Sequence, residues 1–95
     1  MNSGRLAPPM ARAFAPAVRV NAIAPGLLLP SYDQTQAEFE IVASRNPMQR
    51  PIALDDVSSA LEFLLSNAAL TAQVMHVDNG QRLVAAARDV MFETR

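Results

Sequence analysis

The chain has 95 residues, of which 51% are apolar, so it can form one small folded domain rather than a disordered segment. Eight basic and nine acidic residues give a net charge of −1, which leaves no basic field for nucleic acid. The absence of cysteine excludes a disulfide framework, a cysteine-ligated zinc site and a cysteine nucleophile, and no apolar run approaches a membrane span of about 20 residues. We therefore expect a cytoplasmic protein without a nucleic-acid or membrane partner.

Apolar residues recur at helical spacing near the N-terminus, from Leu6 to Phe14. Pro8 and Pro9 lie within this stripe, and proline is well tolerated only in the first turn of a helix. The pattern predicts a helix that begins at Pro8 or Pro9 and ends at about Ala15.

A buried strand is predicted over Val18–Ala24, where nearly every residue is apolar and three are β-branched. This pattern suits a strand covered on both faces, as in parallel sheets. Asn21 is the polar exception, and we expect it to form structural hydrogen bonds rather than to take part in catalysis. The strand stops at Pro25-Gly26. Because open α/β sheets bind ligands at the carboxyl ends of their strands, this turn marks a candidate site.

A second helix is predicted in the middle of the chain. Asp33 with Gln36 resembles a capping box, which places the helix over about Gln34–Ser44. Asn46-Pro47 then ends the helix, and Met48–Ala53 is predicted to be an irregular linker.

The third helix is predicted over Asp55–Asn67. Asp55 and Asp56 lie in its first turn, where carboxylates favour the helix dipole. Adjacent helical side chains point about 100° apart, so these two carboxylates do not form a paired site. The apolar positions of this helix form one broad stripe, which consists of Val57, Ala60, Leu61, Leu64 and Leu65.

The second strand is predicted over Gln73–Asp78. It is followed by the turn Asn79-Gly80, in which either residue accepts a positive φ, and by a stretch of weak helical character over Val84–Arg95. A strand, a crossover that contains helices and a further strand make a βαβ unit. Parallel pairing with a right-handed crossover is therefore expected.

Several polar side chains outside these patterns are interpreted as structural. His76 has no cysteine or second histidine near it that would complete a metal site. Ser58 and Ser59 have no base nearby in the sequence that would activate a nucleophile. The residues therefore predict neither a catalytic group nor a metal site.

Two motifs, Arg19–Gly26 and Ala72–Gly80, each end a predicted strand. The first resembles the sixth strand of short-chain dehydrogenase/reductases, which ends in Asn-x-x-x-Pro-Gly, and the second resembles their seventh strand, which ends in Val-Asp-Gly-Gly. Between them, Arg50 and Asp55-Asp56-Val57 are similar to an arginine followed by a Pro-Glu-Asp helix start. The apolar loop Pro25–Ser31 is most similar to the pteridine-reductase-like branch, and the resemblance covers roughly residues 6–83.

This resemblance implies an NAD(P)-dependent oxidoreductase on a Rossmann-type, doubly wound parallel α/β sheet, usually a homotetramer. Residues 1–95 would form a single partial domain, the C-terminal third of that fold, with two parallel strands and about three helices. The phosphate-binding glycines and the catalytic Ser, Tyr and Lys of the family lie upstream of this segment, with the lysine just before Met1. In agreement, the chain contains no lysine, and its one tyrosine, Tyr32, follows the Pro-Gly turn.

The same resemblance assigns Pro25, Gly26 and Leu28 to the wall of the nicotinamide pocket, where the backbone of Leu28 would hold the carboxamide. Many members of the family have a threonine two residues beyond this position. The chain has Pro30 there, which removes a hydroxyl donor. NAD or NADP is the cofactor of the full-length family, and we do not expect these 95 residues to bind it alone.

Two functions agree with these expectations. The first is a truncated reductase that supplies the pocket wall and an oligomer interface, but has no catalysis of its own and is marginally stable alone. The second is an assembly or regulatory subunit. It would dock onto an intact reductase, or onto a separate N-terminal half, through Asp55–Asn67 and Gln73–Asp78. An enzyme of unrelated mechanism ranks last, because no nucleophile–base pair or metal cluster is present in the sequence.

Overall fold

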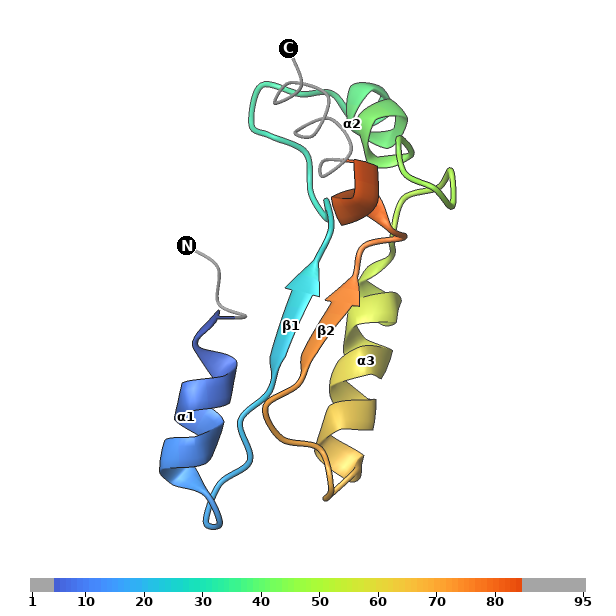
Figure 1. Ribbon diagram of the computed structural model, residues 1–95. Helices are drawn as coiled ribbons and strands as arrows, with labels where there is room; N and C mark the ends of the chain where they lie inside the picture. The colour runs from blue at the N-terminus through green and yellow to red at the C-terminus, as the bar shows by residue number, and fades with distance from the viewer. Residues whose placement is uncertain (1–4, 85–95) are drawn as a thin grey trace. The chain divides into compact units, whose positions relative to one another are not determined.

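A computed structural model of the chain describes residues 5–84, which fall into two compact units. One unit comprises residues 5–25 and 54–77, and the other comprises residues 26–53 and 78–84. Figure 1 shows the elements in chain order: α1 (Ala7–Phe14), β1 (Ala22–Pro25), α2 (Gln36–Ala43), α3 (Leu54–Ser66) and β2 (Val74–Val77). A single helical turn follows at residues 81–84. From residue 85 on, the helical stretch predicted over Val84–Arg95 lies outside the described residues.

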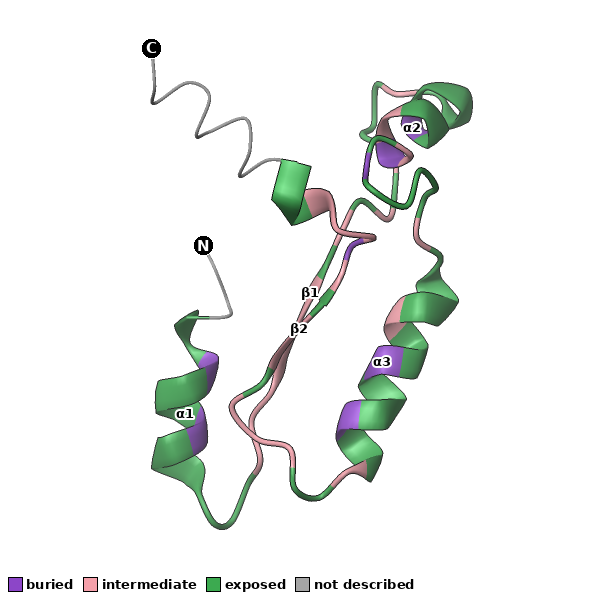
Figure 2. Cartoon of the chain, turned by 45° about the vertical axis from the view of Figure 1, so that its right-hand side comes forward, coloured by how far each residue is buried: buried purple, intermediate pink, exposed green. Residues whose placement is uncertain are grey.

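The first unit contains a two-stranded parallel sheet. β1 pairs with β2 from Ala22 opposite Val74 to Pro25 opposite Val77. Figure 2 shows that the buried positions of α1 and α3 face the strands from opposite sides. The predicted α/β class, the parallel pairing and the three helices are therefore confirmed for residues 5–84.

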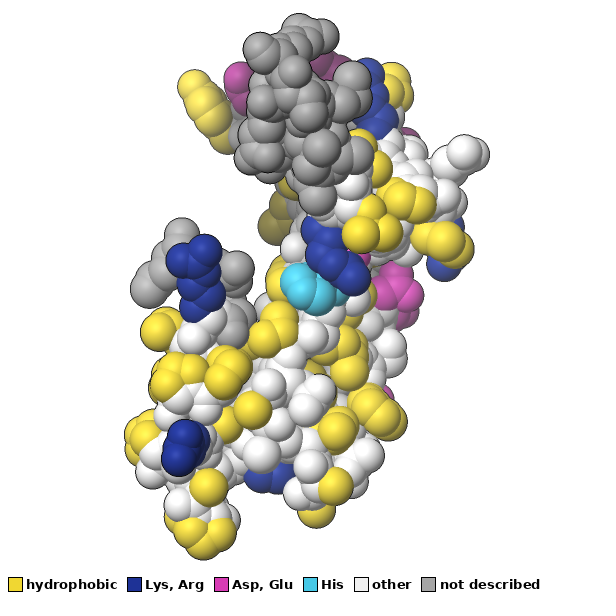
Figure 3. All heavy atoms as spheres, viewed as in Figure 1, with side chains coloured by type: hydrophobic (Ala, Val, Ile, Leu, Met, Phe, Trp, Pro, Cys, Tyr) yellow, Lys and Arg dark blue, Asp and Glu magenta, His cyan; other side chains and the backbone are white. Residues whose placement is uncertain are grey.

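Helix α1 packs on the sheet through small side chains. The prolines Pro8-Pro9 occupy its first turn, as predicted. Ala7 and Ala11 are buried, with exposed fractions of 3% and 2%. Figure 3 shows hydrophobic side chains over the visible surface of this helix. The larger apolar residues are exposed at 45%, 42% and 51%, and they are Leu6, Met10 and Phe14.

Strand β1 begins at Ala22, so the prediction of a strand from Val18 onward was wrong for its first part. The residues before Ala22 are held by a mixture of backbone and side-chain bonds instead of a regular ladder. The N–H of Val20 donates to Oγ1 of Thr71 at 3.1 Å, and its carbonyl accepts the N–H of Ala72 at 2.8 Å. Because a threonine hydroxyl replaces a main-chain carbonyl here, the strand pattern is interrupted although the segment remains extended along its neighbour.

Asn21 forms two hydrogen bonds with the chain that leads into β2. Its Nδ2 donates to the carbonyl of Leu70 at 3.0 Å, and its Oδ1 accepts the N–H of Gln73 at 3.0 Å. The side-chain amide thus extends the pairing of the two strands by imitating a peptide group. This confirms the prediction that Asn21 is a structural hydrogen-bonding residue.

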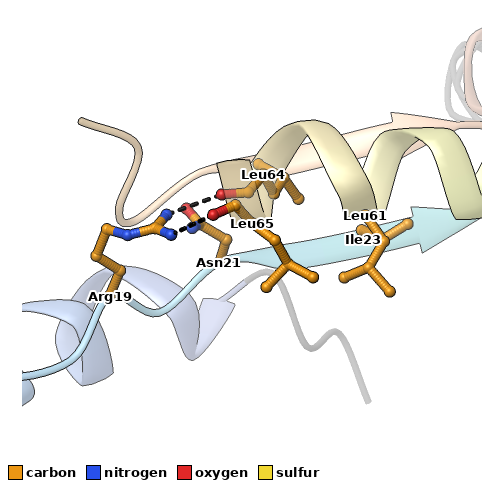
Figure 4. Close-up of a pocket in the computed structure, with 6 residues that line it drawn as sticks. All are labelled: Arg19, Asn21, Ile23, Leu61, Leu64 and Leu65. Carbon is orange, nitrogen blue, oxygen red and sulfur yellow. Dashed lines mark hydrogen bonds between the residues drawn. The ribbon is translucent and has the colours of Figure 1, made fainter. Parts of the chain in front are cut away.

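Arg19 caps the C-terminus of α3. Its Nη1 donates to the carbonyls of Leu64 at 2.8 Å and Leu70 at 2.9 Å, and its Nη2 donates to the carbonyl of Leu65 at 3.0 Å. The last carbonyls of a helix have no partner within the helix, and a cation is favoured at that end by the dipole. One guanidinium therefore joins the segment before β1, the end of α3 and the loop before β2. Figure 4 shows its bonds to the carbonyls of Leu64 and Leu65.

The capping box of α2 lies two residues later than predicted. The expected pair was Asp33 with Gln36, but Thr35 is the N-cap and Glu38 is its partner. Thr35 Oγ1 accepts the N–H of Glu38 at 3.1 Å, and Glu38 Oε1 accepts the N–H of Thr35 at 3.0 Å. The residues before Thr35 form a turn of their own, so the helix begins only where both reciprocal bonds can be made.

The capping box predicts a pH dependence of α2. Hydrogen bonds from the backbone and then the side chain of Thr35 lower the pKa of Glu38 below its ordinary value of 4.5. The contribution of the ionised carboxylate is therefore present above pH 4.5 and is lost as the pH falls through the lowered pKa of the folded chain. We expect the protection factors of the first amides of α2, measured by NMR relative to intrinsic exchange at the same pH, to fall as the pH drops through that lowered pKa. Replacing Glu38 with glutamine is expected to remove this pH dependence, and an unchanged profile in that variant would contradict it.

Helix α3 leaves two of the five residues of its predicted apolar stripe exposed on the surface. Ala60 and Leu64 are buried, with exposed fractions of 9% and 3%. Leu61 and Leu65 lie on the same stripe, but they are 47% and 66% exposed. The two-stranded sheet is too narrow to cover the whole apolar side of this helix. Neither α3 nor any other helix within residues 5–84 is long and apolar enough to cross a lipid bilayer.

Candidate functional site

The two strands end at the same edge of the sheet. Pro25, the last residue of β1, is paired with Val77, the last residue of β2. The chain continues from these ends as Gly26 and Asp78. Since ligands of open α/β sheets bind outside the carboxyl ends of the strands, the candidate site is built from the segments that follow β1 and β2.

Gly26 lies where a side chain would be tightly crowded. A Cβ at this position would lie 3.1 Å from Cα of Asp78, 3.2 Å from Cβ of Asp78 and 3.1 Å from Oε1 of Gln81. The first of these atoms belongs to the backbone and cannot rotate away. Glycine is therefore favoured here by the close approach of the two chain segments rather than by a left-handed backbone.

The carboxylate of Asp78 organises the turn after β2. Asp78 is buried, and its oxygens accept the N–H of Gly80 at 3.0 Å and the N–H of Arg82 at 3.1 Å. Nη1 of Arg82 adds a salt bridge of 3.2 Å. Asn79 and Gly80 have φ values of 52° and 80°, which confirms the predicted left-handed turn. The carboxylate thus accepts hydrogen bonds from the backbone of the turn that follows it. Its role is to hold that turn in place.

The carbonyl of Arg50 is a second organising point, because it accepts two side-chain amides. Nδ2 of Asn46 lies 2.8 Å from it, and Nδ2 of Asn79 lies 2.7 Å from it. Asn46 is buried and also donates to the carbonyl of Ala43, while its Oδ1 has no hydrogen-bond partner within residues 5–84. These contacts were not predicted, since no local pattern marks a partner 29 residues away.

The loop after Gly26 alternates between outward and partly buried residues. Leu27 and Leu29 are 40% and 74% exposed, whereas Leu28 between them is half-buried. Pro25 is exposed and Gly26 is half-buried. Pro25, Gly26 and Leu28 thus lie within four consecutive residues, at and directly after the end of β1.

The other polar candidates lie outside this segment. Tyr32 is fully exposed, and His76 is exposed on β2. The hydroxyl of Ser59 donates to the carbonyl of Asp56 within α3 at 3.1 Å. Among residues 5–84, no three histidine, aspartate or glutamate side chains lie close enough together to hold a metal ion.

Comparison with known proteins connects this geometry to a family. A family model described as enoyl-(acyl carrier protein) reductase matches residues 5–82, which is most of the chain. The chain belongs to the short-chain dehydrogenase/reductase family. Curated relatives include the NADH-dependent enoyl-(acyl carrier protein) reductase FabI of Aquifex aeolicus, which is 36% identical over 72 residues. They also include glucose 1-dehydrogenase of Gluconobacter oxydans, which is 32% identical over 72 residues.

A solved member of the short-chain dehydrogenase/reductase family shares both sequence and fold with the chain. FolM alternative dihydrofolate reductase 1 of Brucella suis, in complex with NADP, is 38% identical and superposes with a TM-score of 0.77. The match covers 84% of this chain but 32% of the FolM chain. For FabI and glucose 1-dehydrogenase, the match covers 70% of this chain and 27% of the relative. The chain therefore spans about a third of the length of the relatives that it matches.

Proposed function

We propose that the chain supplies the C-terminal part of an NAD(P)-dependent reductase, in which Pro25, Gly26 and Leu28 form part of the nicotinamide pocket wall. The observation that carries the proposal is the contact between Gly26 and Asp78, which brings the segments after two neighbouring parallel strands together. The NADP and NADPH complexes of structural relatives support the choice of cofactor. Bound NAD(P)H would supply the hydride, while this segment would position the nicotinamide and shield one side of it from water.

Catalysis by these 95 residues alone is not part of the proposal. The chain has no lysine, and its one tyrosine is fully exposed in the loop before α2. A Ser-Tyr-Lys catalytic group of the family type must therefore come from residues outside this sequence. The proposal places the assembled reductase in the cytoplasm.

Among the substrates of such reductases, the likeness to FolM favours a reduced pteridine as the proposed substrate of the assembled enzyme. The Brucella suis relative carries the name of a dihydrofolate reductase, and the match to it covers 84% of this chain. The exposed leucines of this loop, Leu27 and Leu29, offer the apolar surface that a flat heteroaromatic ring requires. We infer that dihydrofolate is the first substrate to test.

Enhancement of NADPH fluorescence distinguishes cofactor binding by the assembled enzyme from the absence of binding by the chain alone. The 95-residue chain is expected to give no enhancement of NADPH fluorescence, because the phosphate-binding glycines are outside it. Mixed with the part of Brucella suis FolM that lies outside the match, it is expected to enhance NADPH fluorescence and to oxidise NADPH when dihydrofolate is added. The FolM part alone is the control. Tight one-to-one binding of NADPH by the chain alone would overturn the proposal, as would a complex that forms but stays inactive.

A second candidate function is that of an assembly or regulatory subunit. The exposed apolar residues of α3 favour it, since Phe63 and Leu65 are 53% and 66% exposed. In this case Asp55–Asn67 and Gln73–Asp78 would dock onto an intact reductase. Co-purification with intact FolM, together with a change in its dihydrofolate reduction, would support this function over the first.

A further inference from the structure

The turn Asn79-Gly80 contains a chemically labile pair of residues. The side-chain amide of an asparagine is open to attack by the backbone nitrogen of the next residue, and glycine in that place has no side chain to shield its nitrogen. Asparagine belongs to the thermolabile residues of proteins. Among the asparagines of the sequence, Asn79 alone is followed by glycine.

The geometry of the turn explains why this pair is present. Asn79 and Gly80 have φ values of 52° and 80°, in the left-handed region that glycine and asparagine tolerate best. A Cβ on Gly80 would also lie 3.1 Å from Cγ of Pro47. Glycine is therefore favoured at position 80 for two reasons, and asparagine at position 79 completes the labile pair.

In the folded chain, hydrogen bonds hold both groups that would react. The N–H of Gly80, whose nitrogen would attack, donates to Oδ1 of Asp78 at 3.0 Å. Nδ2 of Asn79, which would leave, donates to the carbonyl of Arg50 at 2.7 Å. We call these two hydrogen bonds the Asn79 clasp. The attack requires the Gly80 nitrogen to give up its proton, and the carboxylate of Asp78 beside it repels the negative charge that would develop there.

We propose that Asn79 is a deamidation site, which the clasp keeps closed and which reacts when the turn opens. The nitrogen of Gly80 forms a bond to Cγ of Asn79, the bond from Cγ to Nδ2 breaks, and Nδ2 leaves as ammonia with the proton that the Gly80 nitrogen loses. Water then hydrolyses the cyclic imide. Hydrolysis at Cγ gives aspartate, and hydrolysis at the backbone carbonyl carbon of residue 79 gives isoaspartate. The inference is independent of the proposed function, since water is the one co-reactant.

The products are unable to form the clasp again. An aspartate at position 79 has an acceptor oxygen where Nδ2 donated, so it would face the carbonyl of Arg50 with two acceptors opposed. In isoaspartate the main chain runs through Cγ, which lengthens the turn where Gly80 lies against Pro47. The link between residues 46–50 and the turn after β2 is lost in both cases. Deamidation therefore makes the opening of the turn permanent.

The test follows the deamidation of the full chain by peptide mass spectrometry, in mildly alkaline buffer and in the same buffer with urea. Asn79 is expected to give aspartate and isoaspartate in urea. In buffer the reaction is expected to be about tenfold slower or more, because opening breaks two hydrogen bonds, one of them to a charged group. Asn67, which is followed by alanine, is the internal control and is expected to remain unmodified over the same period.

Replacing Asp78 with alanine tests the clasp itself. In buffer this variant is expected to deamidate about tenfold faster than the unmodified chain, whereas in urea the two rates are expected to agree within about twofold. The matched control is Arg82→Ala, which removes the salt bridge of Asp78 but leaves the hydrogen bond from Gly80 in place. Its rate in buffer is expected to stay within about twofold of the unmodified chain.

Three results would overturn the inference. Asn79 that yields no isoaspartate in urea is not a deamidation site. Equal rates in buffer and urea, while circular dichroism shows the helices retained in buffer, would mean that the fold gives no protection. Equal acceleration by Asp78→Ala and Arg82→Ala would reject the clasp as its source. If Asp78→Ala loses its helices, the comparison of the unmodified chain in buffer and urea still decides, because it requires no variant.

Discussion

Replacing Arg19 with alanine is expected to lower the free energy of unfolding of the first unit by about 2 to 3 kcal/mol. The guanidinium donates to three carbonyls, two at the end of α3 and one in the loop before β2. Its removal leaves helix-terminal carbonyls without a protein partner and deletes a cation from the negative end of the helix. The effect falls in the upper part of the range for single substitutions, because one side chain joins three segments.

Urea unfolding followed by circular dichroism measures this effect, and amide exchange of the loop before β2 shows where it acts. Arg19→Lys keeps the charge but cannot form the same fork of donors, so we expect it to restore less than half of the loss. Arg45→Ala is the matched control, since Arg45 is an exposed arginine outside the first unit. A stability loss in Arg19→Ala no larger than that in Arg45→Ala would show that the three hydrogen bonds contribute nothing measurable.

Replacing Gly26 with alanine is expected to impair the assembled reductase. The new Cβ would approach Cα of Asp78 to 3.1 Å, and this backbone atom cannot rotate away as a side chain can. Overpacking of this kind costs about 1 to 3 kcal/mol, which corresponds to a fall of about 5- to 150-fold if it opposes cofactor binding. Gly26→Val is expected to have the larger effect, since two further methyl groups must be placed.

The measurement is the kcat and KM for NADPH of the chain combined with the FolM part. The expected result is a raised KM for NADPH, because the strain displaces the segment assigned to the nicotinamide. Leu29→Ala is the control in the same loop, as Leu29 is 74% exposed and its truncation leaves the close contact intact. An unchanged KM in Gly26→Val would remove Gly26 from the pocket wall.

Sequence motifs predicted which helices and strands this fold contains better than they predicted the residues at which these elements begin. The strand pattern of Val18–Ala24 is correct in kind, but Thr71 and Asn21 replace ladder bonds with side-chain bonds, so β1 begins at Ala22. Apolar periodicity alone cannot show this, because the partners lie about 50 residues away. The capping box of α2 was misplaced for a related reason: two candidate pairs exist, and only Thr35 with Glu38 completes both bonds.

The candidate site was predictable in part. Pro25-Gly26 and Asn79-Gly80 are recognisable as turns at the ends of strands, and the parallel pairing brings the ends of the two strands to one edge. The contact of Gly26 with Asp78 was not predicted, since it depends on the register of the two strands. The role of Arg50 also escaped prediction, because its backbone carbonyl, rather than its side chain, accepts the two amides.

The distance in sequence between the partners of β1 has a consequence for biosynthesis. The hydrogen-bond partner of Asn21, Gln73, is synthesised 52 residues later in the chain. At about 5 to 20 residues per second, the ribosome needs roughly 3 to 10 s to make that partner. During this interval, the segment that becomes β1 lacks its partner β2 and exposes unpaired backbone along the edge that β2 later covers. A nascent chain of this design is therefore expected to depend on chaperones until β2 has been synthesised.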